Sequence, residues 1–244
     1  MLNIFNLIIK GIIDSDIKIR GNRQKQQNKT ANKSKSASSQ KSDSAVVAKI
    51  KQIAPEMLKE CSHTLPADSD YYRLQSESHG GSNVFFNQAG SDCRFNLVDG
   101  KTGAMYLATS PETAMKEVFQ NKSLIESDLD GYYMGIVTTE RDLTILRSSD
   151  LIRKISLTLH DLTTSVRQDI QYLARVVHHA GFDGMEYPSN VTTEPCFVLW
   201  HGDPSGKGIV KISQQSKFTD WDFSNGKEVA DILVFELGVS VEED

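Results

Sequence analysis

The chain has 244 residues, 39% of them hydrophobic, and a formal net charge of −5 at pH 7. This length and composition fit one domain of ordinary size with tails, or at most two small domains, and they exclude a chain without a packed core. The three cysteines are far apart and form neither a CxxC motif nor a disulfide framework, which favours a reducing compartment.

Charge is distributed unevenly along the sequence. Residues 1–52 hold eleven Lys and Arg against three Asp, a net charge of +8, whereas residues 53–244 carry −13. Lys, Gln, Asn and Ser dominate after residue 16, so residues 16–44 are predicted to form a disordered basic linker. No aromatic residue lies between Phe5 and Tyr71, and the acidic body would repel phosphates, so nucleic-acid binding is not expected.

The apolar segment at residues 1–15 contains LNIFNLIIKGII. It has no basic n-region or cleavage site and is too short to span a bilayer. We therefore interpret it as a docking segment or an extra strand, and we expect a cytoplasmic protein without a membrane span. The sequence leaves export as an effector open. Residues 45–244 are predicted to form the globular domain, with a core at about 71–212.

Regular elements follow in chain order. Helical spacing predicts a short helix over 45–61 and a long one over 164–180, whose apolar face begins at Val166 and which ends before Gly181. A final apolar run, at 232–237, is predicted to be the last of the short strands. Many strands with few helices favour an α+β fold over repeated βαβ units. The predicted strands are 70–74, 106–108, 132–138, 143–146, 196–200, 209–212 and 232–237.

The stretch from residue 93 to residue 121 passes from a strand directly into a helix. Ser110 suits the N-cap, Pro111 the first helical position, and Glu112 the first turn, where the helix dipole favours negative charge. The stretch also contains Arg94 and Tyr106, so it could form one wall of a small-molecule site.

Several side chains admit both a structural and a functional interpretation. Glu117 lies on the flank of the helix, where a solvated glutamate is common. Arg73 and Arg94, interpreted as residues of separate strands, could be packed stems with solvated heads or a clamp for a pyrophosphate. Tyr106 could be a core residue or a platform for a ligand.

Other kinds of chemistry find little support. The adjacent His178 and His179 would point about 100° apart on a helix and no HExxH motif is present, so no metal site is predicted. Cys196 opens an apolar strand and is interpreted as a buried thiol rather than a nucleophile. Walker and GxGxxG loops are absent from the sequence, which argues against phosphoryl transfer and a Rossmann cofactor site.

Three motifs in this order resemble the RES family: an arginine before a short strand, YLATSPETAMKEV with its glutamate, and GFDGMEYPS ending in serine. The resemblance covers about residues 71–212. The family is named for its arginine, glutamate and serine, and its members are NAD⁺-degrading toxins of bacterial toxin–antitoxin pairs. The resemblance implies a fold similar to that of ADP-ribosyltransferases, with a split mixed β-core, flanking helices and a cleft for NAD⁺.

The resemblance also implies roles for individual residues. Arg73 follows a tyrosine pair, Arg94 stands in an R-F-N motif, and both would hold the phosphates of NAD⁺. Glu117 would stabilise the positive charge that develops on the ribose, Tyr106 would pack on the ribose or nicotinamide, and Ser189 would hydrogen-bond a hydroxyl or carboxamide. The sequence departs from the family where 97–99 replace a proline-rich turn, and it adds terminal extensions.

The expected function is cleavage of the nicotinamide–ribose bond of NAD⁺ by hydrolysis or phosphorolysis, in a bacterial toxin. NAD⁺ would be a substrate rather than a cofactor, and inorganic phosphate a co-substrate. An antitoxin or immunity protein would be the partner, and the oligomeric state is left open. Two alternatives are a mono-ADP-ribosyltransferase acting on a protein and a non-enzymatic interaction module.

Overall fold

The computed structural model describes residues 44–90, 93–120, 122–163, 166–223 and 226–243. The apolar segment 1–15 and the predicted linker, apart from Ser44, lie outside the described residues. Ser44 caps the first described helix, α2, by accepting a hydrogen bond from Val47 N, and its hydroxyl donates to Asp169.

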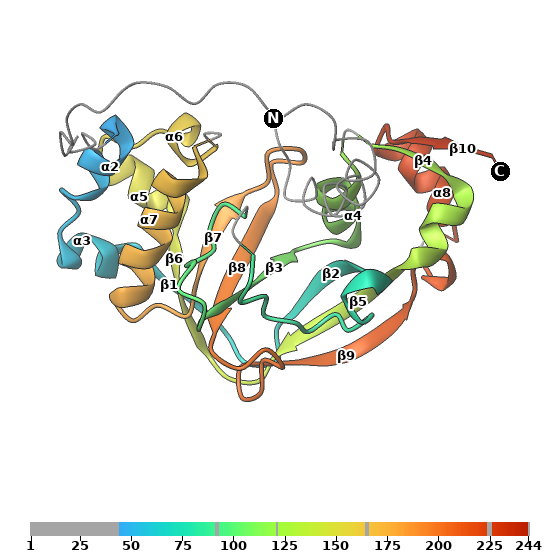
Figure 1. Cartoon of the computed structure of the whole chain (residues 1–244), viewed down its shortest axis with the longest axis horizontal. Helices are drawn as coiled ribbons and strands as arrows, with labels where there is room; N and C mark the ends of the chain where they lie inside the picture. Colours follow the sequence, from blue (N-terminus) through green and yellow to red (C-terminus); the bar gives the residue numbers. More distant parts are fainter. Residues whose placement is uncertain (1–43, 91–92, 121, 164–165, 224–225, 244) are drawn as a thin grey trace, which may run out of the picture.

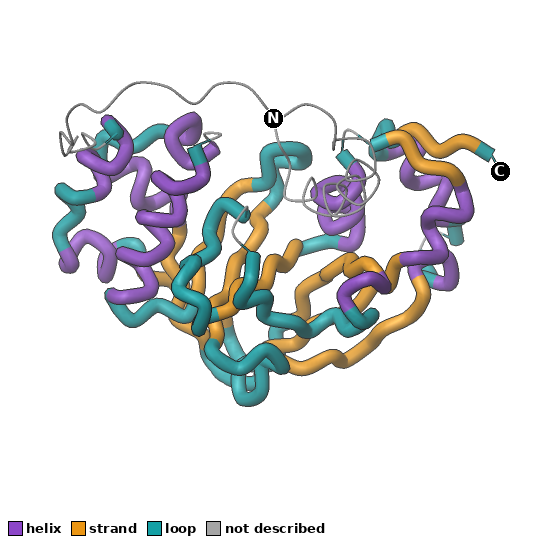
Figure 2. Tube along the Cα trace, viewed as in Figure 1, coloured by secondary structure: helices purple, strands orange, loops and turns teal. Residues whose placement is uncertain are grey.

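The described chain is organised around a curved sheet of eight strands in the order β1-β6-β7-β8-β3-β2-β5-β9 (Figures 1 and 2). The pair β6–β7 is parallel and the other neighbours are antiparallel, so the sheet is mixed. The strands are β1 (Ser62–Leu65), β2 (Asp70–Ser76), β3 (Gly103–Ala108), β5 (Tyr132–Thr139), β6 (Leu143–Arg147), β7 (Gly184–Pro188), β8 (Pro195–His201) and β9 (Val210–Lys217).

The sheet opens between two neighbouring strands in its middle. Strand β3 pairs with β8 along its whole length, and β2 pairs with β5 along its whole length. In contrast, β2 and β3 are paired at a single position, Tyr72 opposite Ala108. Beyond that pair the two strands diverge, which confirms the split mixed β-core that the resemblance implied.

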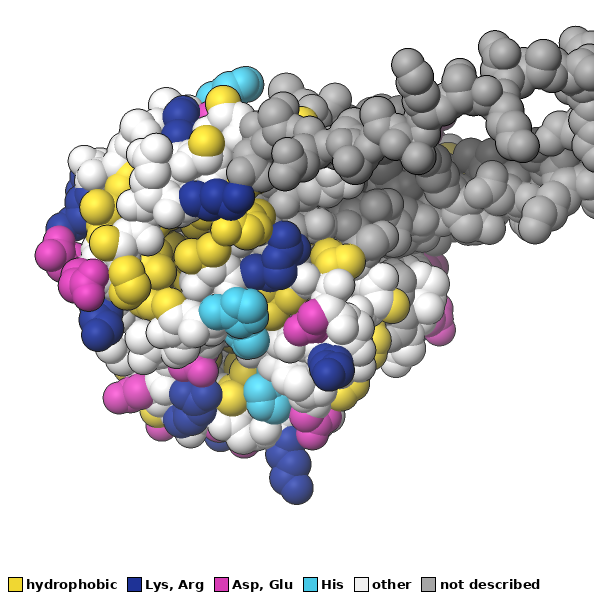
Figure 3. Space-filling view, turned by 60° about the vertical axis from the view of Figure 1, so that its left-hand side comes forward, with side chains coloured by type: hydrophobic (Ala, Val, Ile, Leu, Met, Phe, Trp, Pro, Cys, Tyr) yellow, Lys and Arg dark blue, Asp and Glu magenta, His cyan; other side chains and the backbone are white. Residues whose placement is uncertain are grey.

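Helices flank the sheet at both ends (Figure 1). Those beside β6 and β7 present a surface on which apolar and basic side chains lie together (Figure 3), and Leu159 and Val166 are half exposed there. Helix α4 stands over the split. The helices beside β6 and β7 are α2 (Ala45–Ile50), α3 (Pro55–Glu60), α5 (Ser148–Lys154), α6 (Leu159–Thr163) and α7 (Arg167–His179); α4 covers Pro111–Phe119.

Shorter elements complete the other end of the molecule. Strands β4 and β10 form a parallel pair there, close to the C-terminus (Figure 1). The elements are β4 (Ser123–Ile125), β10 (Ser240–Glu242), α8 (Val229–Asp231), the 3₁₀ turns η1 (Glu77–His79), η2 (Glu126–Gly131) and η3 (Phe218–Asp220), and the π-helical turn η4 (Ile232–Glu236).

Each face of the sheet contributes to its own apolar core, because side chains alternate along a strand. Met105 and Leu107 of β3 belong to a core on one face, while Ala104 and Ala108 belong to the larger core under the helices. Tyr106 packs against the larger core, which places its ring on the face that α4 covers.

Three predictions of elements were wrong, one of them entirely and two in part. The single helix over 45–61 is two helices, because Pro55 starts the second one and the residue before it, Ala54, is extended. The predicted strand at 232–237 is helical. The long helix begins at Arg167, and Val166 is a non-helical residue with 48% exposure rather than a buried one. The predicted left-handed Gly181 is confirmed, with φ of 91°.

Candidate active site

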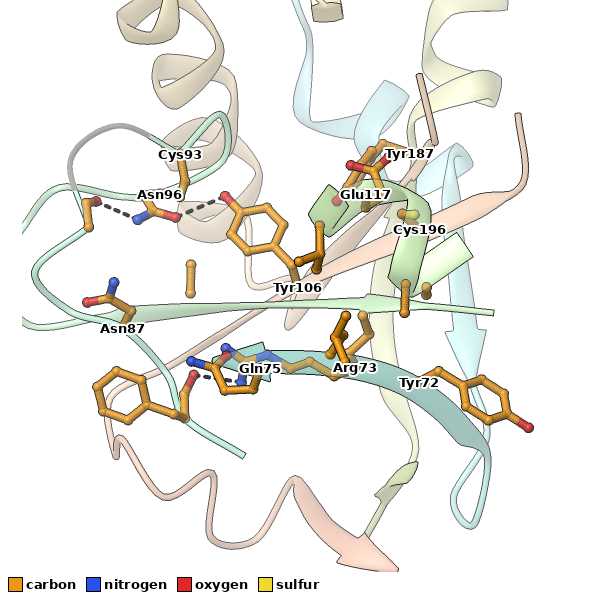
Figure 4. A pocket seen from close by; sticks show the side chains of 18 of the residues that line it. Tyr72, Arg73, Gln75, Asn87, Cys93, Asn96, Tyr106, Glu117, Tyr187 and Cys196 are labelled. Carbon is orange, nitrogen blue, oxygen red and sulfur yellow. Dashed lines mark hydrogen bonds between the residues drawn. The ribbon is translucent and has the colours of Figure 1, made fainter. Parts of the chain in front are cut away.

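A cavity of about 400 Å³ lies where β2 and β3 separate (Figure 4). Side chains from β2, β3, α4, β7 and β8 form its walls, and the segments 85–90 and 93–96 close another side. The lining includes Tyr72, Arg73, Gln75, Asn87, Cys93, Asn96, Tyr106, Glu117, Val118, Tyr187 and Cys196. Three of the five predicted site residues are among them: Arg73, Tyr106 and Glu117.

Glu117 reaches the cavity because of how α4 begins and packs. Ser110 caps the helix by accepting a hydrogen bond from Thr113 N at 3.1 Å, and Pro111 occupies the first turn, as predicted. The neighbours of Glu117 on the buried face, such as Met115 and Val118, are anchored in the core. Glu117 is therefore held half-buried on the flank of the helix, facing the cavity rather than open solvent.

Ser189 lies directly behind this carboxylate. It follows the last residue of β7, is only 4% exposed, and its hydroxyl donates to Glu117 Oε1 at 2.7 Å. The hydroxyl oxygen of Ser189 itself accepts hydrogen bonds from Val191 N and Thr192 N, both at 3.1 Å. Because those two N–H groups occupy its acceptor positions, the hydroxyl proton of Ser189 is directed at Glu117.

Arg73 brings a positive charge to the same cavity. Its Nη1 donates to Asn83 O at 3.0 Å and Phe85 O at 3.2 Å, and no carboxylate of the described residues forms an ion pair with it. Burial lowers the pKa of Arg73 to about 10, so the guanidinium is still charged at neutral pH. A partly buried cation held by two neutral carbonyls, with further N–H groups to spare, is suited to bind an anion.

Tyr106 combines a ring that lines the cavity with a hydroxyl that holds a loop. The hydroxyl donates to Asn96 Oδ1 at 2.9 Å (Figure 4) and accepts from Phe95 N at 3.1 Å. Asn96 in turn donates to Gly90 O. Burial raises the pKa of Tyr106 well above its ordinary value, so the phenol keeps the proton that it donates.

Arg94 lies behind the wall of the cavity rather than in it. It belongs to a turn, which corrects the interpretation of Arg94 as a strand residue: the described part of this stretch becomes a strand only at Gly103. The side chain is 5% exposed, and its guanidinium carbon is 5.2 Å from the ring centroid of Tyr187 and 5.5 Å from that of Phe95. A cation stacked in this way raises the positive potential near Tyr187, which does line the cavity.

Two residues of the cavity wall had no role in the sequence analysis. Tyr187 stands two residues before Ser189, and alternation along β7 was a usable signal that both face the same side. Burial, with the nearby Cys196 and Glu117, raises the pKa of Tyr187 well above its ordinary value. Asn96, which joins Tyr106 to Gly90, is the last residue of the R-F-N motif, but the sequence analysis gave it no role.

The cysteine on β8 is not equipped for nucleophilic catalysis. Cys196 is buried, and burial together with the charge of Glu117 raises the pKa of its thiol. It therefore stays protonated at neutral pH.

The described residues contain neither a metal-binding cluster nor a membrane-spanning helix. Nowhere in this part of the chain do three His, Cys, Asp or Glu side chains gather closely enough to hold a metal ion. None of the helices that the structure describes is both long and apolar enough to cross a membrane.

A mixed sheet that opens into a cavity holding a carboxylate and an arginine defines an α+β protein with a candidate enzyme site in its split. A sequence model of the RES domain matches residues 70–222, more than half of the chain, and the protein therefore belongs to the RES-domain family. This confirms the family inferred from the three motifs, and the matched range lies close to the predicted core.

A solved structure supports the fold. The chain is similar to a chain of the crystal structure of the M. tuberculosis MbcT–MbcA toxin–antitoxin complex, with a TM-score of 0.50 and 16% sequence identity. The likeness covers 66% of this chain and 90% of that one. A comparison with curated proteins finds no match.

Proposed function

We propose that the protein cleaves the nicotinamide–ribose bond of NAD⁺. The observation that carries this proposal is the pairing, in one cavity, of the oriented carboxylate of Glu117 with the guanidinium of Arg73, which has no acidic partner among the described residues. A dinucleotide with a cationic glycosidic centre and an anionic pyrophosphate needs one group of each sign. Membership of the RES family, whose members degrade NAD⁺, agrees with this assignment.

The proposed reaction breaks the bond between C1″ of the nicotinamide ribose and the nicotinamide nitrogen. The bonding electron pair leaves with nicotinamide, and positive charge develops on C1″ and the ring oxygen of that ribose, as in glycoside hydrolysis. Glu117 lies where it can stabilise that charge and orient the attacking acceptor, whose proton it or solvent then receives. Ser189 holds the carboxylate in place, and the predicted hydrogen bond from Ser189 to the substrate remains a separate hypothesis.

Arg73 would hold the pyrophosphate through the N–H groups that protein carbonyls do not use. Arg94 would act at longer range, because the ring of Tyr187 separates its guanidinium from the cavity. Tyr106 would offer its ring to the ribose or nicotinamide while its hydroxyl holds the loop at Phe95 and Asn96. The positions and charges of these residues in and beside the cavity support these roles.

We further propose that the protein is a toxin of a toxin–antitoxin pair that acts in the cytoplasm and is neutralised by a partner protein. The resemblance to a chain of a toxin–antitoxin complex supports this reading, as does the family. Co-expression with the product of a neighbouring gene, scored by growth and by cellular NAD⁺, tests it. Growth arrest that the neighbour does not relieve would contradict the pairing.

The reaction is tested with purified full-length protein and NAD⁺, with and without inorganic phosphate, followed by mass spectrometry of the products. Nicotinamide with ADP-ribose in both conditions would establish hydrolysis, and ADP-ribose 1″-phosphate formed only with phosphate would establish phosphorolysis. Radiolabel transferred from NAD⁺ to a protein band would establish the ADP-ribosyltransferase alternative. Absence of all three products would overturn the proposal in favour of a binding module.

A further inference from the structure

The loop between β7 and β8 lies against the first turn of α4. Ser189 begins this loop and Glu194 ends it, and the loop is closed by a hydrogen bond from Ser189 N to Glu194 O at 2.8 Å. Thr193 adopts a left-handed conformation with φ of 67°, which is unfavourable for a β-branched residue. The loop therefore needs contacts that hold it in this shape.

The carboxylate of Glu194 supplies such contacts. Its Oε2 accepts hydrogen bonds from Thr113 Oγ1 at 2.5 Å and Ser110 Oγ at 2.8 Å, and a longer one from Thr109 Oγ1 at 3.5 Å. One oxygen thus binds the hydroxyl groups of Thr113 and Ser110 at the N-terminus of α4, where the helix dipole also favours a negative charge. The single hydroxyl proton of Thr109 has a closer acceptor in Pro195 O, at 3.2 Å. Thr113 Oγ1 lies 3.1 Å from Thr192 Oγ1, and this contact adds a second link between the loop and the helix.

The contacts of the loop extend to the hydrogen bond between Ser189 and Glu117 at the cavity. The hydroxyl of Ser189 is oriented by the N–H groups of Val191 and Thr192, both in the loop, so the shape of the loop decides where its proton points. That proton is donated to Glu117, on the same helix that Glu194 binds. A continuous path of hydrogen bonds therefore runs from the first turn of α4 through the loop and back to the middle of α4.

We propose that Glu194 is a positioning residue, which clamps the 189–194 loop onto α4 and thereby sets the Ser189 hydroxyl against Glu117. It does not line the cavity. Glu194 lies at the surface, where a glutamate is a carboxylate at neutral pH, and the hydrogen bonds from Thr113 and then Ser110 lower its pKa further. The effect on catalysis rests on the proposed function, but the clamp itself does not.

The test uses Glu194→Ala, which removes the clamp, Thr113→Val, which removes a hydroxyl donor at nearly constant shape, and Glu194→Gln, which keeps an acceptor oxygen. Glu243→Gln is the matched control, because this carboxylate is exposed and follows β10, outside the loop and α4. Two quantities are measured in the full chain: the kinetics of nicotinamide release, and amide hydrogen exchange at Val191 and Thr192.

We expect Glu194→Ala to lower kcat about tenfold with KM within about twofold, because Glu117 loses its orientation while the phosphate site is untouched. Thr113→Val should also lower kcat. The loss of kcat in the double variant Glu194→Ala/Thr113→Val should be smaller than the two single losses combined, and Glu194→Gln should retain part of the activity that Glu194→Ala loses. Exchange at Val191 and Thr192 should rise about tenfold in Glu194→Ala.

Glu194→Ala with wild-type kcat and unchanged exchange would overturn the proposal, as would an equal effect of Glu243→Gln. If the wild-type protein releases no nicotinamide, the proposed function fails and hydrogen exchange alone decides on the clamp. The two failures are thus distinguishable.

Discussion

The hydroxyl of Ser189 donates to Glu117 Oε1 at 2.7 Å, although 72 positions separate the two residues in the sequence. The contact joins the end of β7 to the middle of α4 across the edge of the cavity. The Ser189 hydroxyl donates its single proton in this bond, and its oxygen accepts hydrogen bonds from two backbone N–H groups. A serine used in this way orients the carboxylate rather than reacting itself.

Ser189→Ala should therefore reduce both activity and stability. It removes the donor to Glu117 and leaves the N–H groups of Val191 and Thr192 without their acceptor. We expect a loss of about 1–3 kcal/mol in the free energy of unfolding, from urea titration, and about a tenfold fall in kcat for nicotinamide release. Ser62→Ala, at an exposed serine of β1, is the control. Unchanged kcat in a folded Ser189→Ala protein would contradict the positioning role.

Arg73→Lys tests whether the guanidinium binds the phosphates. Lysine keeps the charge but lacks the planar fork, so KM for NAD⁺ should rise about tenfold with a smaller change in kcat. Arg153→Lys, at an arginine whose side chain is 78% exposed, should leave KM unchanged. An equal KM for wild type and Arg73→Lys would place the phosphates elsewhere.

Tyr106→Phe separates the two uses of this side chain. The ring remains, but Phe95 N loses its acceptor and Asn96 loses its donor. The free energy of unfolding should fall by about 1–3 kcal/mol. Tyr133→Phe on β5, away from the cavity, is the matched control. If thermal and urea unfolding of Tyr106→Phe match the wild type, the hydroxyl does not hold the loop.

The clamp at Glu194 should respond to acid. Because hydrogen bonds from Thr113 and Ser110 lower its pKa below the ordinary value of 4.5, the folded state favours the carboxylate. Its contribution to stability is present above about pH 4.5 and is lost as the pH falls through the lowered pKa. The stability difference between wild type and Glu194→Gln, at most about 1 kcal/mol at this exposed site, should then shrink from pH 7 to pH 3. A difference that grows toward pH 3 would show the opposite sign.

Local signals in the sequence predicted much of the fold. The cap at Ser110, the strand ending in Ala108 and the left-handed Gly181 depend on short-range chemistry, and the structure confirms each. Helix 164–180 was predicted from periodicity, but its first turn was placed too early because Val166 is apolar yet exposed. Apolar spacing also could not separate helix from strand at 232–237.

The candidate site was predictable only where a motif named its residues. Arg73, Tyr106 and Glu117 were chosen from motifs, and they share one cavity because β2 and β3 separate after a single pair. The divergence of β2 from β3 has no local signature in the sequence, because it depends on how two strands distant in sequence pair. The contacts of Glu194 with α4 likewise join residues that are distant in sequence. The same holds for Arg94, whose position behind Tyr187 depends on tertiary packing.

The most direct test of the central claim compares Glu117→Gln with Glu112→Gln in an assay of nicotinamide release from NAD⁺. Both residues belong to α4 and both changes remove one charge, but only Glu117 lines the cavity. We predict that Glu117→Gln folds normally and loses about a hundredfold or more in kcat, while Glu112→Gln stays near wild type. Near-normal release of nicotinamide by folded Glu117→Gln would contradict the account.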